Sequence, residues 1–117
     1  MDPIERLKKN LEASIQAKHE FLADTECLSL FANAVEIVVD RYKHGGHIFI
    51  AGNGGSAADA QHLAAEFVSK LARDRAPLPA EALTVDSSTL TAIGNDYGFD
   101  QVFSRQLAGK ATDKDVF

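Results

Sequence analysis

The segment from His47 to Ser56 constrains the fold of this chain more than any other. A short apolar run, His47–Ala51, is followed at once by Gly52-Asn53-Gly54-Gly55-Ser56, and an alanine-rich stretch then continues to about Arg73. The apolar run is typical of a buried strand in a parallel sheet, and the alanine-rich stretch is typical of a helix. A strand that turns directly into a helix predicts an α/β fold with right-handed crossovers.

The flanking segments extend this pattern. We expect helices over 4–22 and from the caps Asp24 or Thr25 to Gly45-Gly46, a second strand over 82–85, a helical turn over 89–93 and a loop over 94–98. A short helix over 100–108 and the start of a third strand at 115–117 follow. The chain thus divides into an N-terminal helical hairpin, 1–44, and the first part of an α/β domain, 45–117. The apolar faces of the hairpin need a sheet or a second subunit as partner.

Two complete strands are fewer than the roughly five or six of an average sheet. We therefore expect that the C-terminal half of the fold is missing from this sequence, or that neighbouring chains supply the remaining strands.

Charge and composition exclude several classes of protein. With 12 Lys and Arg against 17 Asp and Glu, the net charge is −5, which argues against a sequence-independent nucleic-acid binder. No apolar run approaches the roughly 20 residues of a membrane span, and the N-terminus lacks the apolar core of a signal peptide. The single cysteine, Cys27, excludes an intramolecular disulfide, and we expect it to be a buried, inert thiol. A cytoplasmic protein is the default expectation.

The glycine-rich turn is a candidate anion site. Its backbone N–H groups precede a helix, where the helix dipole favours negative charge, and Ser56 adds a hydroxyl. A tight turn that merely needs glycine is the alternative, but the carboxyl end of a parallel strand is where open α/β sheets bind ligands, so a phosphate or sugar is favoured. The turn is not a dinucleotide fingerprint, because the third glycine would stand at Ala57.

His62 and Glu66 are four residues apart on the predicted helix and share one face. Such a pair can bind one Zn²⁺ or transfer protons, although a solvated surface pair is the more common case. Two ligands are fewer than the three or four of a normal zinc site, and His44 and His47 lie at the far end of the strand, where we expect them at the surface.

Polar residues also follow the second predicted strand. The run Asp86–Thr89 could bind sugar hydroxyls or cap a helical turn, and capping is favoured for one or two of the four. Asn95 and Asp96 could bind neighbouring hydroxyls or simply form a turn.

Together these motifs resemble a known family. The run Ala51–Phe67, the run Leu90–Gly98 and the segment Val102–Gln106 are similar to those of the phosphoheptose isomerases. These are sugar-isomerase (SIS) domain proteins that interconvert sedoheptulose 7-phosphate and D-glycero-D-manno-heptose 7-phosphate, which supplies heptose for lipopolysaccharide. The resemblance covers essentially the whole chain and implies a flavodoxin-like, three-layer α/β domain.

The resemblance implies a role for each matching residue. His62 and Glu66 would bind one Zn²⁺ per subunit, and Glu66 would also be the acid/base that moves a proton between sugar carbons through an ene-diol. Members are typically cytoplasmic homotetramers with the N-terminal helices in subunit contacts. The implied substrate-binding residues are Asn53, Gly54, Gly55, Ser56, Glu66, Asn95 and Asp96.

Two departures from the family pattern matter. Lys70 stands where these enzymes commonly carry arginine. Lysine keeps the positive charge but cannot form the two parallel hydrogen bonds of a guanidinium group. The sequence also stops before the family's Ser/Thr-rich phosphate loop and its late glutamine and histidine, which complete the zinc site. Two alternatives to an enzyme therefore stay open: a non-catalytic phosphosugar-binding fragment, or a relative that binds a partner protein. Relatives of the latter kind tend to lose the carboxylate at Glu66, so its presence favours the enzyme.

Overall fold

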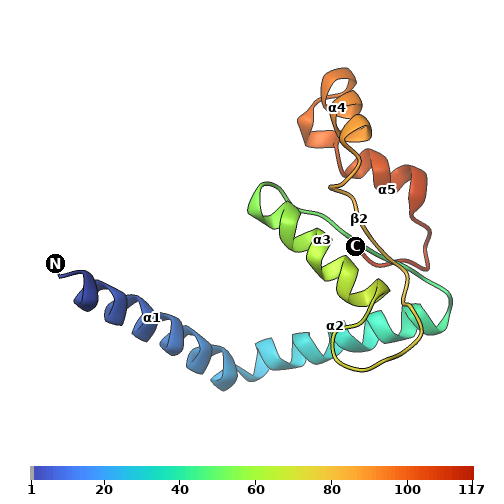
Figure 1. Ribbon diagram of the computed structural model, residues 1–117. Helices are drawn as coiled ribbons and strands as arrows, with labels where there is room; N and C mark the ends of the chain where they lie inside the picture. The colour runs from blue at the N-terminus through green and yellow to red at the C-terminus, as the bar shows by residue number, and fades with distance from the viewer. Residues whose placement is uncertain (1) are drawn as a thin grey trace. The chain divides into compact units, whose positions relative to one another are not determined.

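The computed structural model describes residues 2–117 (Figure 1). The elements within these residues are α1 (Pro3–Ala23), α2 (Thr25–Lys43), β1 (Ile48–Ile50), α3 (Gly55–Val68), β2 (Ala80–Ala82), α4 (Ser87–Asp96), the 3₁₀ turn η1 (Phe99–Gln101) and α5 (Ser104–Lys110). The chain forms two compact units, one up to Ile37 and one from Val38 onward. None of the helices described here combines the length and apolar character needed to cross a bilayer.

Asp24 separates the first two helices and caps the second. Its carboxylate accepts hydrogen bonds from the backbone N–H groups of Glu26, at 3.0 Å, and Cys27, at 3.1 Å. These bonds satisfy N–H groups that have no partner within the helix, and they hold the pKa of Asp24 below its ordinary value. One of the two predicted caps is thereby confirmed. The prediction of a buried Cys27 is wrong: its side chain is partly exposed and its Sγ lies 3.3 Å from the Asp24 carboxylate, which raises the pKa of the thiol.

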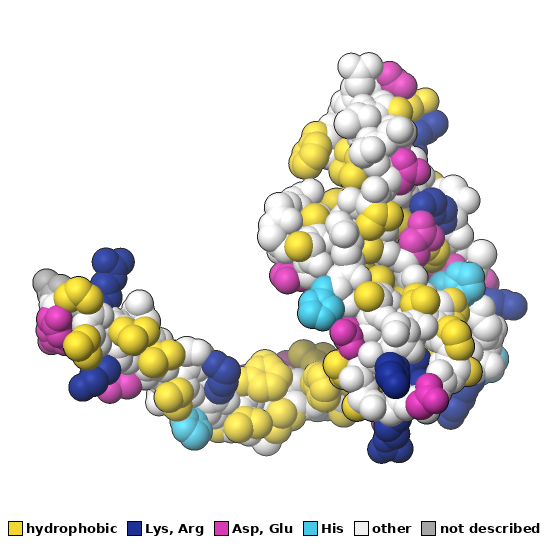
Figure 2. Space-filling model, in the orientation of Figure 1, with side chains coloured by type: hydrophobic (Ala, Val, Ile, Leu, Met, Phe, Trp, Pro, Cys, Tyr) yellow, Lys and Arg dark blue, Asp and Glu magenta, His cyan; other side chains and the backbone are white. Residues whose placement is uncertain are grey.

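Apolar side chains gather along α1 and the first part of α2 (Figure 2). No residue of α1 is buried, and Leu7, Leu11 and Ile15 are each more than half exposed, at 57%, 55% and 54%. The apolar stripe that predicts a helix here therefore has no partner among the described residues. The proposed domain boundary between residues 44 and 45 stays a prediction.

The parallel sheet is confirmed. β1 and β2 pair in register, with Ile48 opposite Ala80 and Ile50 opposite Ala82. On the other edge of β1, Val116 forms a parallel bridge with Ile48, and the Phe49 N–H donates to the Val116 carbonyl at 2.8 Å. The sheet of the described residues has two strands, and a single bridge at Val116 stands where the start of a third strand was predicted.

Helices cover both faces of the sheet. On one face Ala82 packs in a buried cluster with Ala60 and Ala64 of α3. Glu81 points to the opposite face, because successive side chains of a strand alternate, and there its carboxylate meets Lys110 of α5 at 2.6 Å. The order of helix, sheet and helix gives the three layers expected of an α/β domain, and it places β1 at the centre with the turn after it free to bind.

Several predicted boundaries are wrong. The second strand is Ala80–Ala82 instead of 82–85, because its register follows β1, and a turn begins at Leu83. The helix after the glycine-rich turn ends at Val68 and not near Arg73, because Arg75 reaches back and donates to the carbonyls of Glu66 and Phe67, both at 2.8 Å. These bonds satisfy carbonyls that a helix end leaves without partners.

The segment after β2 is more helical than predicted. α4 runs over Ser87–Asp96, so it includes the residues 94–96 that were expected in a loop and extends beyond the predicted turn 89–93. Gly98, with φ of +105°, marks the real break. The predicted helix 100–108 is two elements, η1 and α5.

Candidate functional site

The turn after β1 requires glycine at two positions, Gly52 and Gly54, for different reasons. Gly54, the N-cap of α3, has φ of +56°, a left-handed conformation that other residues rarely adopt. A Cβ at Gly52 would lie 2.6 Å from the backbone oxygen of Ser56, so the first turn of α3 can sit there only on a glycine. The glycines therefore bring the N-terminus of α3 directly beside the end of β1.

This turn forms one wall of a cavity of about 440 Å³. Its lining is apolar apart from a few polar groups, which is the usual character of a small-molecule pocket. Thr84, which follows β2, lines it and donates from Oγ1 to the carbonyl of Ala57 at 3.3 Å. The lining residues are Gly52, Asn53, Gly54, Ala57, Thr84, Leu90, Thr91, Gly94, Phe99, Val102 and Phe103.

The structure brings only some of the predicted substrate residues to this cavity. Asn53 and Gly54 line it, whereas Gly55 and Ser56, one step further into α3, do not. Asn95 and Asp96 lie exposed at the end of α4, where the Asn95 amide donates to the Asp96 carboxylate at 3.0 Å. Leu90, Thr91 and Gly94, earlier in the run Leu90–Gly98, line the cavity instead.

Asp86 caps α4. Its carboxylate accepts from the backbone N–H of Thr89 at 3.0 Å, and this bond holds the pKa of Asp86 below its ordinary value. The capping interpretation of the run Asp86–Thr89 is confirmed for this residue.

His62 and Glu66 meet on the surface of α3. The distance from His62 Nε2 to Glu66 Oε1 is 3.2 Å, and the side chains are 78% and 28% exposed. They line a separate shallow pocket with Asp59 and Leu63. Neither residue lines the cavity at the glycine-rich turn, and Glu66 is nine positions beyond Ala57, about 13.5 Å along the helix axis at 1.5 Å per residue.

The pair can offer one imidazole nitrogen and one carboxylate to a metal ion. Among residues 2–117 no group of three or more His, Cys, Asp or Glu side chains is placed to share an ion. Catalytic zinc normally has three protein ligands. His62 and Glu66 alone are fewer donors than that.

Comparison with known proteins identifies the family. Residues 11–117 match the family model of the SIS domain. The chain belongs to the SIS domain family. Relatives of this SIS domain include the phosphoheptose isomerases of Aneurinibacillus thermoaerophilus, 50% identical over 95% of this chain and 56% of the relative, and of Clostridium acetobutylicum, 47% identical over 94% and 56%. The predicted resemblance is confirmed.

Solved structures of phosphoheptose isomerases are also similar to this chain. A phosphoheptose isomerase from Neisseria gonorrhoeae is 42% identical with a TM-score of 0.85, over 97% of this chain and 58% of that one. One from Francisella tularensis is 36% identical with a TM-score of 0.89, over 98% and 59%. The SIS domain chain thus spans about half the length of the relatives it matches.

Sequence reasoning missed the far wall of the cavity. Phe99, Val102 and Phe103 line it. They were not singled out as substrate residues because their local pattern is that of ordinary core residues in a short helix. Thr84 gave a usable signal, since it lies near the end of the predicted strand 82–85, on the edge where the glycine-rich turn ends β1.

Proposed function

We propose that a protein carrying this chain interconverts sedoheptulose 7-phosphate and D-glycero-D-manno-heptose 7-phosphate, and so supplies heptose for lipopolysaccharide precursors. The observation that carries this proposal is the glycine-rich turn at the end of β1, which lines a cavity in a chain about half identical to proteins named phosphoheptose isomerase. The backbone N–H groups at the start of α3 suit an anion such as a phosphate.

The reaction needs a group that moves a proton between two carbons. A base removes a proton from C1 of the ketose while the carbonyl oxygen at C2 gains one, which gives an ene-diol. Return of a proton to C2, with loss of the proton on the C1 hydroxyl, gives the aldose. We assign the acid/base role to Glu66, whose side chain is about one-quarter exposed and lies against His62 in the shallow pocket on α3, beside the cavity lining and not within it.

His62 and Glu66 are also the residues that we assign to Zn²⁺, one ion per subunit. An imidazole nitrogen and a carboxylate oxygen are both accepted zinc ligands, and zinc would supply polarisation of a substrate oxygen. Asn53, Gly54, Gly55, Ser56, Asn95 and Asp96 are proposed to hold the substrate; of these, Asn53 and Gly54 line the cavity.

The test is turnover of sedoheptulose 7-phosphate by the purified protein. Glu66→Gln should lower kcat by about 10²–10⁴-fold, as for loss of a general acid/base. Glu36→Gln is the matched control, because Glu36 is exposed on α2 and has no assigned role. Equal kcat values for Glu66→Gln and the parent would reject Glu66 as the acid/base, and absence of turnover by the full-length parent would reject the proposed reaction.

A second function is proposed for the 117 residues by themselves: phosphosugar binding without turnover. It is favoured by the cavity and by the finding that, within residues 2–117, no three His, Cys, Asp or Glu side chains are placed to share an ion. Calorimetric titration with sedoheptulose 7-phosphate, beside the turnover assay, distinguishes the two. Turnover by these residues alone at the rate of an intact enzyme would exclude the binding-only role.

A further inference from the structure

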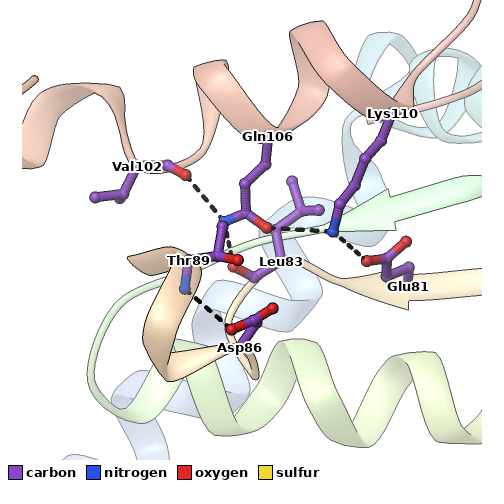
Figure 3. Close-up of polar contacts among 7 residues, drawn as sticks. All are labelled: Glu81, Leu83, Asp86, Thr89, Val102, Gln106 and Lys110. Atoms are coloured by element: carbon purple, nitrogen blue, oxygen red, sulfur yellow. Dashed lines mark hydrogen bonds and ion pairs between the residues drawn. The ribbon is translucent and has the colours of Figure 1, made fainter. Parts of the chain in front are cut away.

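Gln106 of α5 is the one polar side chain that is buried among the described residues, with 5% of its surface exposed. Its amide nitrogen donates two hydrogen bonds, to the backbone carbonyls of Leu83 and Val102, both at 2.9 Å (Figure 3). A glutamine amide has two N–H donors, so both are used on main-chain oxygens.

The two carbonyls belong to two separate segments that contribute residues to the cavity lining. Leu83 immediately precedes Thr84, and Val102 lines the cavity itself beside Phe103. Leu83 and Val102 are only 1% and 3% exposed, so water cannot readily replace a lost donor at either carbonyl. An unpaired buried carbonyl carries its full desolvation penalty.

A cation lies beside the oxygen of this amide. The Lys110 ammonium lies 3.5 Å from Gln106 Oε1 and is held by the Glu81 carboxylate at 2.6 Å (Figure 3). Reversal of the amide would place its oxygen against two carbonyl oxygens and its N–H groups against the ammonium. β2, the turn after it and the η1–α5 junction are therefore connected by one satisfied polar network.

We propose that Gln106 is a positioning residue of the phosphosugar cavity: it fixes the distance between the wall that carries Thr84 and the wall that carries Val102 and Phe103. This inference rests on the proposed function for its substrate, but the connection itself is independent of the reaction. Gln106 is buried behind the cavity and is not one of its lining residues, so it acts on binding more than on the proton transfer.

The test compares Gln106→Met with Gln101→Met in the full-length protein. Both changes replace an amide by a thioether of similar length, but Gln101 is exposed on η1 and its side chain makes no hydrogen bond to the described residues. Hydrogen exchange should become about tenfold faster in peptides covering 83–86 and 99–103 of Gln106→Met, since buried carbonyls lose their donors. KM for sedoheptulose 7-phosphate should rise about tenfold, with kcat changed less than about threefold, as for lost ground-state binding.

Three other results would overturn the proposal, and a fourth would separate it from the proposed reaction. Unchanged exchange in both segments overturns the proposal, and so does equal acceleration in β1 and α3, which would make Gln106 a residue of general stability. A rise in KM for Gln101→Met of the same size also overturns it. If local exchange changes but neither the parent nor the variants turn over the sugar phosphate, the tie between the walls stands and the proposed reaction fails.

Discussion

At the scale of single residues, the glycines of the turn after β1 are not equivalent. A Cβ at Gly52 would meet the backbone of Ser56 at 2.6 Å, whereas one at Gly55 would meet nothing within 4 Å. We expect Gly52→Ala to lower the free energy of unfolding by about 1–3 kcal/mol, the usual cost of overpacking. Gly55→Ala should stay within about 0.5 kcal/mol of the parent.

Urea unfolding followed by circular dichroism measures both variants under the same conditions. Gly54→Ala belongs in the same series, because its φ of +56° penalises any side chain even though the space is open. If Gly52→Ala were as stable as Gly55→Ala, the close approach of α3 to the turn would be contradicted.

The His62–Glu66 pair leads to a prediction about metal. Zn²⁺ binding should require both side chains, because they lie 3.2 Å apart and can contact the same ion. The binding should be weak, because two protein ligands leave at least two coordination positions to water. His62→Ala and Glu66→Ala should each lower zinc affinity by about tenfold or more, the scale on which loss of even supporting partners acts. Asp40→Ala is the control, because Asp40 of α2 forms a similar i,i+4 contact, at 3.4 Å, with His44 just after the helix.

Isothermal titration of Zn²⁺ into the three variants and the parent decides this prediction. Parent-like binding by both His62→Ala and Glu66→Ala would leave the pair as a helix-surface contact.

At the scale of elements, Asp115 holds the C-terminal segment, whose Val116 forms a bridge with β1. Its carboxylate accepts from the backbone N–H groups of Thr112 and His47, both at 2.7 Å, and the two bonds lower the pKa of Asp115. Since the folded pKa lies below the unfolded value of about 3.9, the stabilisation is present at pH values above about 4. It is lost as the pH falls through the folded pKa.

We therefore expect Asp115→Asn to lower the thermal midpoint at pH 7 and to differ less from the parent near pH 2. Asp113→Asn is the control, because Asp113 is held through its backbone carbonyl, which accepts from Arg41 at 2.6 Å. Thermal melts of the three proteins across pH 2–7 test this. A constant difference between Asp115→Asn and the parent over the whole range would contradict the assignment.

The sequence predicts elements well where the pattern is local and poorly where tertiary contacts decide. The helix 4–22 and the strand at Ile48 follow from periodicity and glycine boundaries, and the structure has both. The strand Ala80–Ala82 was displaced in the prediction because Leu83-Thr84-Val85 is the more apolar run, while pairing with β1 sets the real register. The end of α3 depends on Arg75, a contact across nine residues that no periodicity reveals.

The site was predictable to the same extent. The glycine-rich turn can be recognised in the sequence because its backbone geometry needs glycine. The His62–Glu66 contact follows from helical spacing. The tie of Gln106 to Leu83 and Val102 could not be predicted, because it joins positions 23 and 4 residues apart through a side chain that looks ordinary on a helix.

At the scale of the whole molecule, the stripe on α1 predicts self-association. Ile4, Leu7, Leu11 and Ile15 recur at helical spacing and are all more than half exposed. Contiguous apolar surface of this kind marks protein–protein contacts. We expect several copies of the chain to bury these stripes against one another, in line with the tetramer that the family resemblance implies.

The variant Leu11→Gln/Ile15→Gln should dissociate at protein concentrations where the parent stays assembled. Burying one such side chain contributes about 1.5–3 kcal/mol, so each loss weakens association by roughly tenfold or more. Lys8→Gln/Glu12→Gln is the matched control: it changes two exposed residues of the same helix and leaves the net charge unchanged. Sedimentation velocity across a concentration series reports the species present. If the parent sediments as a monomer throughout, or if the apolar variant assembles as the parent does, the stripe on α1 is not a subunit contact.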